Sequence, residues 1–199
     1  QTEMNDAQRN FDNYFIGCYI MQEPLINSLL EWKELNKEFG KKTSVQNKEV
    51  SNKDIIKVCL EWGIENNNMY YPWGNYQKAL KNCIDKYFSR YPQSQKVTPF
   101  LHLERIYNLQ HYKPGEGFWA WHKENIGDKE SIRRHLVFMT YLTTTPNAGT
   151  EFQAQNLTVP CEKGVTLIWP AGWTHTHRGQ ISNTHEKTIV TGWITLSEE

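Results

Sequence analysis

The sequence lacks several features that would assign it to common functional classes. No apolar run approaches the roughly 20 residues that cross a bilayer, and the first residues lack the apolar core of a signal peptide. Its 22 Lys and Arg balance 22 Asp and Glu without a basic cluster, which argues against a broad nucleic-acid-binding surface. Gln1 in place of an initiator methionine is consistent with trimming at the N-terminus. We therefore expect a cytoplasmic protein that does not enter membranes.

Cysteine is also scarce, with four residues at positions 18, 59, 83 and 161. No two are spaced as CxxC, which excludes a zinc knuckle and a thioredoxin-type redox pair. Their wide spacing is typical of reduced, mostly buried thiols. The length suits one domain with a buried core, so we expect a single domain over residues 1–199.

The first half of the chain has the pattern of helices. Apolar residues recur at helical intervals from Glu23 to Phe39, and a stronger stripe runs from about Gly74 to Tyr91. A further helix is predicted to begin at residues 51–54, ahead of several Ile and Val residues. The segment Tyr14–Met21 is typical of a short apolar strand.

Beyond residue 95 the pattern becomes that of β-structure. Segments rich in Val, Ile, Thr and aromatic residues alternate with turns that contain Pro and Gly. The predicted strands are His102–Tyr112, His135–Thr144, Gly164–Trp169 and Lys187–Leu196, and the predicted turns are residues 113–115, 146–149 and 170–172. Many short strands after a few helices predict helices packed on one face of a β-sandwich or jelly roll.

The segment His122-Lys123-Glu124 is the first candidate for chemistry. Residues i and i+2 of an extended chain point to the same side, and two His with one carboxylate hold Fe(II) in non-haem oxygenases. This short pattern is common by chance, so it requires a second histidine downstream. Both His175 and His177 qualify, and strand alternation cannot separate them. Lys187, ten residues beyond His177, begins an apolar segment where a cation needs a partner, and a dicarboxylate would supply one.

The order of these residues resembles that of the prolyl 4-hydroxylase-like 2-oxoglutarate/Fe(II) dioxygenases. The matching elements are, in order, Tyr112-Lys113-Pro114-Gly115, His122-Lys123-Glu124, Tyr141-Leu142, Gly149-Thr150-Glu151-Phe152, His177, Lys187 and Trp193-Ile194. The resemblance implies an α+β fold, a double-stranded β-helix (jelly roll) with N-terminal helices packed on one face. Residues 96–199 would form the jelly-roll catalytic core and residues 1–95 the helical support.

One departure from the family pattern is Glu124, where the family usually has Asp. Glutamate is one methylene longer, so its carboxylate must fold back or the strand must shift. We expect the geometry of this branch to have adjusted to the longer side chain, since the surrounding elements are intact.

The resemblance also implies a role for each site residue. The catalytic iron ligands would be His122, Glu124 and His177, and the residues that bind 2-oxoglutarate would be Lys187, Tyr141 and Tyr112. Dioxygen would take the remaining position on Fe(II), with ascorbate as an optional accessory reductant. Taken singly, each tyrosine could equally be a core residue, and Lys187 could be a strand-edge lysine. Trp119 and Trp121, beside the metal motif, are predicted to lie in an aromatic core or on the floor of a substrate cleft.

The sequence therefore predicts a hydroxylase that decarboxylates 2-oxoglutarate to succinate while hydroxylating a C–H bond. The substrate would be a peptidyl residue, with proline as one candidate, or a free amino acid. Two alternatives stay open. One is an oxidative nucleic-acid demethylase, which the neutral net charge disfavours. The other is a catalytically silent jelly-roll metal- or ligand-binding module, which the replacement of the usual Asp by Glu124 leaves as an alternative. Substrate selection is expected on the loops at residues 125–134 and 144–149.

Overall fold

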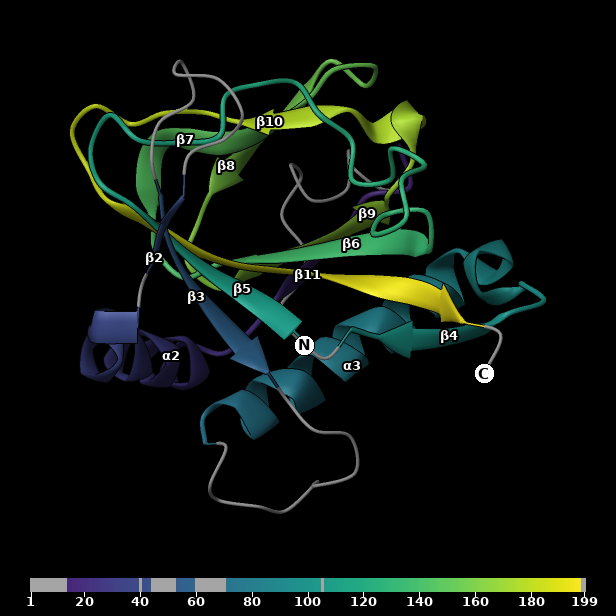
Figure 1. The fold of residues 1–199 in the computed structure, drawn as a ribbon, viewed down its shortest axis with the longest axis horizontal. Helices are drawn as coiled ribbons and strands as arrows, with labels where there is room; N and C mark the ends of the chain where they lie inside the picture. The colour runs from purple at the N-terminus through teal and green to yellow at the C-terminus, as the bar shows by residue number, and fades with distance from the viewer. Residues whose placement is uncertain (1–13, 40, 44–52, 60–70, 105, 198–199) are drawn as a thin grey trace.

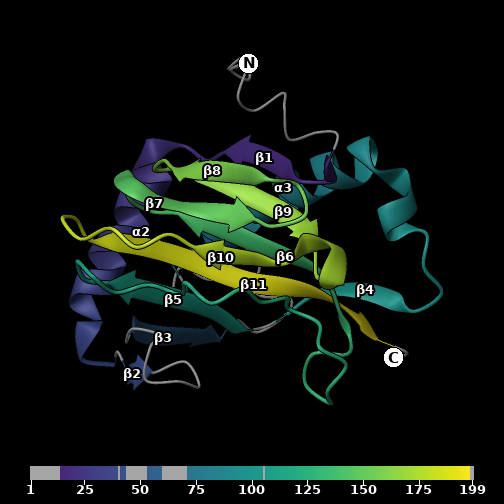
Figure 2. The ribbon, with the colours of Figure 1, turned by 90° about the horizontal axis from the view of Figure 1, so that it is seen from above.

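The computed structural model describes residues 14–39, 41–43, 53–59, 71–104 and 106–197. In this part of the chain, a large and a small β-sheet are stacked, and two α-helices pack on the outer face of the large sheet (Figures 1 and 2). The helices are α2 (Glu23–Leu35) and α3 (Trp73–Arg90), and the 3₁₀ turns are η2 (Lys37–Phe39), η4 (Pro92–Gln95) and η5 (Trp173–His175).

Both sheets are antiparallel between the described strands. The large sheet has the order β1-β9-β6-β11-β5-β3-β2, with β4 also paired to β11, and the small sheet has the order β10-β7-β8. The large sheet contains β1 (Gly17–Ile20), β2 (Lys41–Thr43), β3 (Lys53–Cys59), β4 (Phe100–Leu103), β5 (Ile106–Tyr112), β6 (Arg134–Tyr141), β9 (Val165–Pro170) and β11 (Lys187–Ser197). The small sheet contains β7 (Thr145–Phe152), β8 (Leu157–Cys161) and β10 (His177–Gly179).

Strand β6 shows how the fold separates two apolar cores. Its Leu136 and Phe138 pack in a cluster with residues of α2 and α3. The alternate residues Val137, Met139 and Tyr141 point to the opposite face and pack in a second cluster with strands of the small sheet. This period of two is the ordinary consequence of strand geometry, and it leaves one face of the large sheet directed at the small sheet.

The fold class predicted from the sequence is confirmed: the curled antiparallel sheets form a jelly roll with helices on one face. The helices predicted from Glu23 and Gly74 are present as α2 and α3. The helix predicted to begin at residues 51–54 is wrong for residues 53–59, which form β3 paired to β5. Three β-branched residues, Ile55, Ile56 and Val58, favour the strand there, and the neighbouring β5 supplies its hydrogen-bonding partner. Residues 51–52 and 60–70 lie outside the described part.

The turn predicted at residues 146–149 is wrong as well, because those residues lie within β7. The pairing of β7 with β8 is irregular between Thr145 and Thr150, which accommodates Pro146 and the positive φ of Asn147. Gly149 has a steric reason to be glycine. A Cβ at this position would lie 2.1 Å from the carbonyl oxygen of Val159 in β8.

Replacing Gly149 with alanine is expected to lower the free energy of unfolding by about 1–3 kcal/mol, since the added methyl group would force β7 away from β8. Gly74→Ala is a suitable control. Its new Cβ would meet nothing within 4 Å near the start of α3, so it should be neutral or stabilising. Chemical denaturation of both variants measures the difference. Equal stability of G149A and the wild type would show that the two strands can separate without strain.

Two expectations from composition can be compared with the described part of the chain. Cys18, Cys83 and Cys161 are buried and in the thiol form, as predicted, and the side chain of Cys59 lies outside the described residues. None of the described helices has both the length and the apolar character needed to span a bilayer.

Candidate active site

His122 and His177 come together through a short backbone bridge. The two residues exchange N–H···O=C hydrogen bonds of 2.9 Å in each direction, although they are far apart in the sequence. His177 begins β10 of the small sheet, and the backbone N–H of Glu124 donates to the carbonyl of Ala171, 3.2 Å away. These bonds fix both ends of the candidate metal motif against the segment that follows β9.

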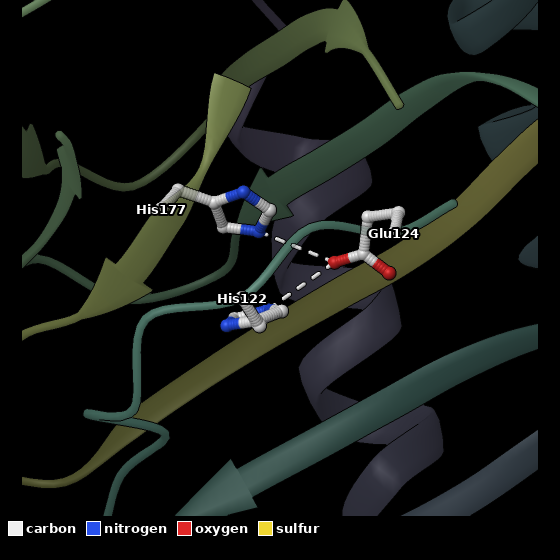
Figure 3. A group of neighbouring side chains, drawn as sticks. All are labelled: His122, Glu124 and His177. Carbon is white, nitrogen blue, oxygen red and sulfur yellow. Dashed lines mark ion pairs between the residues drawn. The ribbon is translucent and has the colours of Figure 1, made fainter. Parts of the chain in front are cut away.

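The side chains of His122, Glu124 and His177 converge on one point (Figure 3). The Oε1 atom of Glu124 lies 3.3 Å from Nε2 of His122 and 3.2 Å from Nε2 of His177. One ligand atom from each of the three residues can be chosen so that all three atoms lie within 4.8 Å of one another. The structure thus places together the three residues that the sequence predicted as ligands.

The orientation of both imidazoles suits metal binding. Nδ1 of His122 lies 2.9 Å from the carbonyl oxygen of Ala120, and Nδ1 of His177 lies 2.9 Å from that of His175. A carbonyl oxygen only accepts, so each Nδ1 donates a proton, and Nε2 is the ring atom directed at the shared point, where it would bind a metal ion. Two imidazole nitrogens and one carboxylate oxygen are the donor set that non-haem Fe(II) takes, so these residues fit the ion.

His175 is placed differently from His177, although alternation predicted the same face. Residues 173–175 form the turn η5, so alternation does not apply across them. The Nε2 atom of His175 instead donates to the carbonyl oxygen of Tyr14, 2.7 Å away, and its ring is buried. The distal candidate ligand is therefore His177.

Opposing effects act on the Glu124 carboxyl. Burial alone would raise its pKa, but the hydrogen bonds and charges of His122 and His177 outweigh burial and hold the pKa well below its usual range. Glu124 is thus a carboxylate at neutral pH, which is the form that binds a cation.

A cavity of about 540 Å³ opens beside the three side chains, and Lys187 lines it. Lys187 is only 6% exposed, at the start of β11. No carboxylate of the described side chains lies within ion-pair distance of its ammonium, and burial lowers its pKa to about 8. A buried cation without an anionic partner is costly, so the cavity suits an anionic group of a ligand.

The two candidate tyrosines flank Lys187. Its Nζ lies 5.9 Å from the ring centre of Tyr112 and 5.6 Å from that of Tyr141. The Tyr112 hydroxyl donates to Oε1 of Gln110 at 2.8 Å, and the Tyr141 hydroxyl shares a 2.5 Å hydrogen bond with Thr150. Burial raises the pKa of both tyrosines above the ordinary value, so both stay neutral hydrogen-bonding groups. Tyr112 lines the cavity with Lys187.

Several neighbours of the site carried no clear signal in the sequence. The prediction that Trp119 and Trp121 belong to an aromatic core is wrong, because they are 37% and 39% exposed. Trp121 stacks against the guanidinium of Arg178, 4.1 Å from the ring centre. Trp193, which the sequence showed only as part of a motif, donates to Glu124 from 69 residues away. Such a contact depends on strand register and rotamer, which no local pattern specifies.

Comparisons with known proteins agree with this geometry. Residues 107–195 match the family profile of the 2OG-Fe(II) oxygenase superfamily. A search among curated proteins found no match.

Solved structures share the fold across nearly the whole chain. A prolyl-4-hydroxylase from Pseudomonas putida is 14% identical with a TM-score of 0.66, covering 95% of this chain and 97% of that one. The viral collagen prolyl hydroxylase of Paramecium bursaria Chlorella virus-1, in a 2OG complex, is 14% identical with a TM-score of 0.62 (90% and 95% covered). A prolyl hydroxylase from Trichoplax adhaerens, in complex with a peptide fragment, is 10% identical with a TM-score of 0.65 (98% and 94% covered).

The matched segment runs from β5 to β11 and contains all six residues that the sequence singled out. This segment, a little under half of the chain, is similar to the 2OG-Fe(II) oxygenase superfamily, and the solved structures share the fold of the whole chain.

Proposed function

We propose that this chain is a dioxygenase that uses Fe(II), 2-oxoglutarate and O2 to hydroxylate an uncharged peptidyl residue, with His122, Glu124 and His177 as the iron ligands. The observation that carries the assignment is the convergence of two imidazole nitrogens and one carboxylate oxygen, within 4.8 Å of one another, at the wall of a cavity. Bound Fe(II) supplies the redox chemistry in which 2-oxoglutarate and O2 give succinate and CO2 while one oxygen atom enters a C–H bond.

Lys187 is proposed to bind the C5 carboxylate of 2-oxoglutarate. Its ammonium is buried at the same cavity as the three candidate ligands and has no carboxylate partner among the described side chains. A charge-assisted hydrogen bond to the co-substrate would satisfy this cation and fix the orientation of the keto acid. The hydroxyl of Tyr141, on the neighbouring strand β6, is proposed to assist, and Tyr112 to lie along the co-substrate.

The cavity wall supports a peptidyl substrate more than a free amino acid. Apart from the three proposed ligands, the charged side chains described at the wall are Lys123, which is exposed, and Lys187. A free amino acid carries an ammonium and a carboxylate, and burying both would require a charged partner for each. A peptide bond is neutral, so an uncharged residue within a chain needs no such partners. The three structural relatives described above are named prolyl hydroxylases, which makes a prolyl residue the first substrate to test.

The test measures succinate release with a panel of proline-containing peptides, in the presence and absence of Fe(II) and 2-oxoglutarate, with ascorbate as a reductant. We expect release only with both present, and a gain of about 16 daltons in one peptide, the mass of one oxygen atom. Thermal protection by Mn(II) and 2-oxoglutarate without any succinate would instead identify a silent binding module. Turnover of methylated single-stranded DNA but no peptide would identify a demethylase. Either result would overturn the proposal.

The affinity for 2-oxoglutarate is expected to fall at high pH. The pKa of Lys187 in the ligand-free protein is about 8, so below this pH the lysine is already protonated. Above it, binding a carboxylate requires uptake of a proton, and the KM for 2-oxoglutarate should rise roughly tenfold per pH unit above about 8. Lys187→Arg is the control, because a guanidinium stays protonated over this range. The same rise in K187R would assign the titration to another group.

A further inference from the structure

The two carboxylate oxygens of Glu124 have different partners. Oε1 lies 3.3 Å and 3.2 Å from the two imidazole Nε2 atoms, and Figure 3 shows both dashed lines ending on this one oxygen. Oε2 instead accepts a hydrogen bond from the indole Nε1 of Trp193 at 3.2 Å. The carboxylate is therefore held with one oxygen toward the proposed metal position and the other bound to the protein.

Arg134 contacts both Glu124 and Trp193. Its Nη1 donates to the backbone carbonyl of Glu124 at 3.1 Å and lies 3.9 Å from Oε2. Its guanidinium also stacks on Trp193, with Cζ 3.8 Å from the ring centre. Arg134 and Trp193 stand on β6 and β11, which pair side by side in the large sheet. Two paired strands of one sheet thus carry both groups that contact Glu124.

The longer side chain of glutamate needs a restraint that aspartate does not need. Compared with aspartate, which the sequence pattern of the family usually has here, glutamate has one more methylene and one more rotatable bond. A free glutamate could swing out of reach of the histidines, or present both oxygens to the ion and take a position that 2-oxoglutarate or O2 requires. Binding of Oε2 by the indole N–H restrains both movements.

We propose that Trp193 and Arg134 are positioning residues that allow a glutamate to serve in this iron site, by holding Oε2 so that only Oε1 faces the metal. The inference rests on the proposed function, since it requires that His122, Glu124 and His177 bind the ion. It extends that function by explaining how this chain accommodates the longer carboxylate.

Removal of the indole donor is expected to weaken metal binding without abolishing it. Trp193→Phe keeps an aromatic ring under Arg134 and deletes the N–H. Residues that orient a metal ligand typically contribute 10–100-fold in metal affinity, so the dissociation constant for Co(II) should rise by about that factor. The visible absorption of bound Co(II) should also change, because it reports the number and arrangement of ligands.

Glu124→Asp supplies an independent readout. The shorter carboxylate is not expected to reach the indole and the two imidazoles together, so the Trp193 bond should be lost in this variant. If so, Trp193→Phe should have little further effect on Co(II) affinity in the E124D background. A merely structural role of Trp193 would give the same loss in both backgrounds, so the non-additivity separates the two explanations.

The experiment uses the full chain, with Co(II) binding measured by absorption and calorimetry for W193F, R134M, E124D and E124D/W193F. Trp121→Phe is the matched control: it is the same substitution three residues from Glu124, but that indole stacks on Arg178 instead. Thermal unfolding without metal identifies any variant that fails to fold. If W193F fails to fold, R134M tests the proposal in its place. R134M is expected to weaken Co(II) binding, by no more than W193F.

The expected result is weaker Co(II) binding with an altered spectrum in W193F, unchanged binding in W121F, and a small W193F effect in E124D. Wild-type affinity and spectrum in W193F, or full additivity with E124D, would overturn the inference. His177→Ala distinguishes its failure from that of the proposed function. If H177A loses Co(II) binding while W193F does not, only the positioning role is wrong. If H177A binds Co(II) normally, the proposed metal site itself is wrong.

Discussion

His177→Ala is expected to eliminate iron-dependent turnover. The substitution deletes one of two imidazoles whose Nε2 atoms face Glu124 Oε1, leaving one imidazole and one carboxylate at the proposed site. Even residues that only support a metal ligand contribute about 10–100-fold in affinity or activity, so loss of a ligand should lower succinate formation by more than about 100-fold. Direct measurement of Fe(II) or Co(II) binding should show a parallel loss, because the defect lies in holding the ion.

His175→Ala is the matched control for this prediction. It removes another buried histidine two residues away, which contacts the Tyr14 carbonyl and not Glu124. The loss of that hydrogen bond should lower stability by about 1–3 kcal/mol. Succinate formation per folded molecule should change far less than in H177A, because alanine keeps the backbone carbonyl that accepts the His177 proton. A larger loss of turnover in H175A than in H177A would reverse the assignment of the distal ligand.

The choice between these two histidines shows where sequence reasoning reached its limit. The spacing of His177 to Lys187 favoured His177 only through a family resemblance, while strand alternation treated His175 and His177 alike. The structure separates them because η5 ends at His175, so the two side chains are not on one strand. A tight turn of three residues without a Gly or Pro inside it leaves little trace in composition.

The large features of the fold were predictable because they follow from local periodicity. The apolar stripe of α3 and the β-branched segments of β6 and β11 each identify a buried face, and helices on one face of a jelly roll follow. The errors fell where tertiary pairing overrides local signals. Residues 146–149 look like a turn but pair with β8, and residues 53–59 follow a helix-start pattern but pair with β5.

Contacts around Glu124 could not be predicted for a related reason. The sequence identified the carboxylate and the change from aspartate, but nothing in it indicated that Trp193 or Arg134 would contact that side chain. Both contacts depend on the register between β6 and β11, in which Trp193 pairs with Val137, and on the path of the loop that returns to Arg134. That loop is held by Asn125, whose amide donates to the carbonyls of Ile132 and Arg134.

Lys187→Met should have the second large effect, on co-substrate binding. Methionine has a similar length and no charge, so the C5 carboxylate of 2-oxoglutarate would enter a buried site without a cation. Breaking a buried charge pair by removing one partner costs about 3–5 kcal/mol, which corresponds to a rise of at least about 100-fold in the KM for 2-oxoglutarate. Metal affinity without the co-substrate should stay near that of the wild type. A wild-type KM in K187M would mean that another group binds the carboxylate.

The same substitution is expected to stabilise the ligand-free protein, which distinguishes a binding lysine from a structural one. Burial lowers the pKa of Lys187 from 10.5 to about 8, so its charged form destabilises the fold by up to about 3 kcal/mol. This penalty is fully present below about pH 8 and disappears above about pH 10.5, where the lysine is neutral in both the folded and unfolded chain. Denaturation at neutral pH should therefore show K187M to be more stable than the wild type, and the gap should close at high pH. Lower stability of K187M would indicate that Lys187 has an anionic partner within the protein. The lysine would then have a structural role, and its burial would not be evidence for binding of the co-substrate.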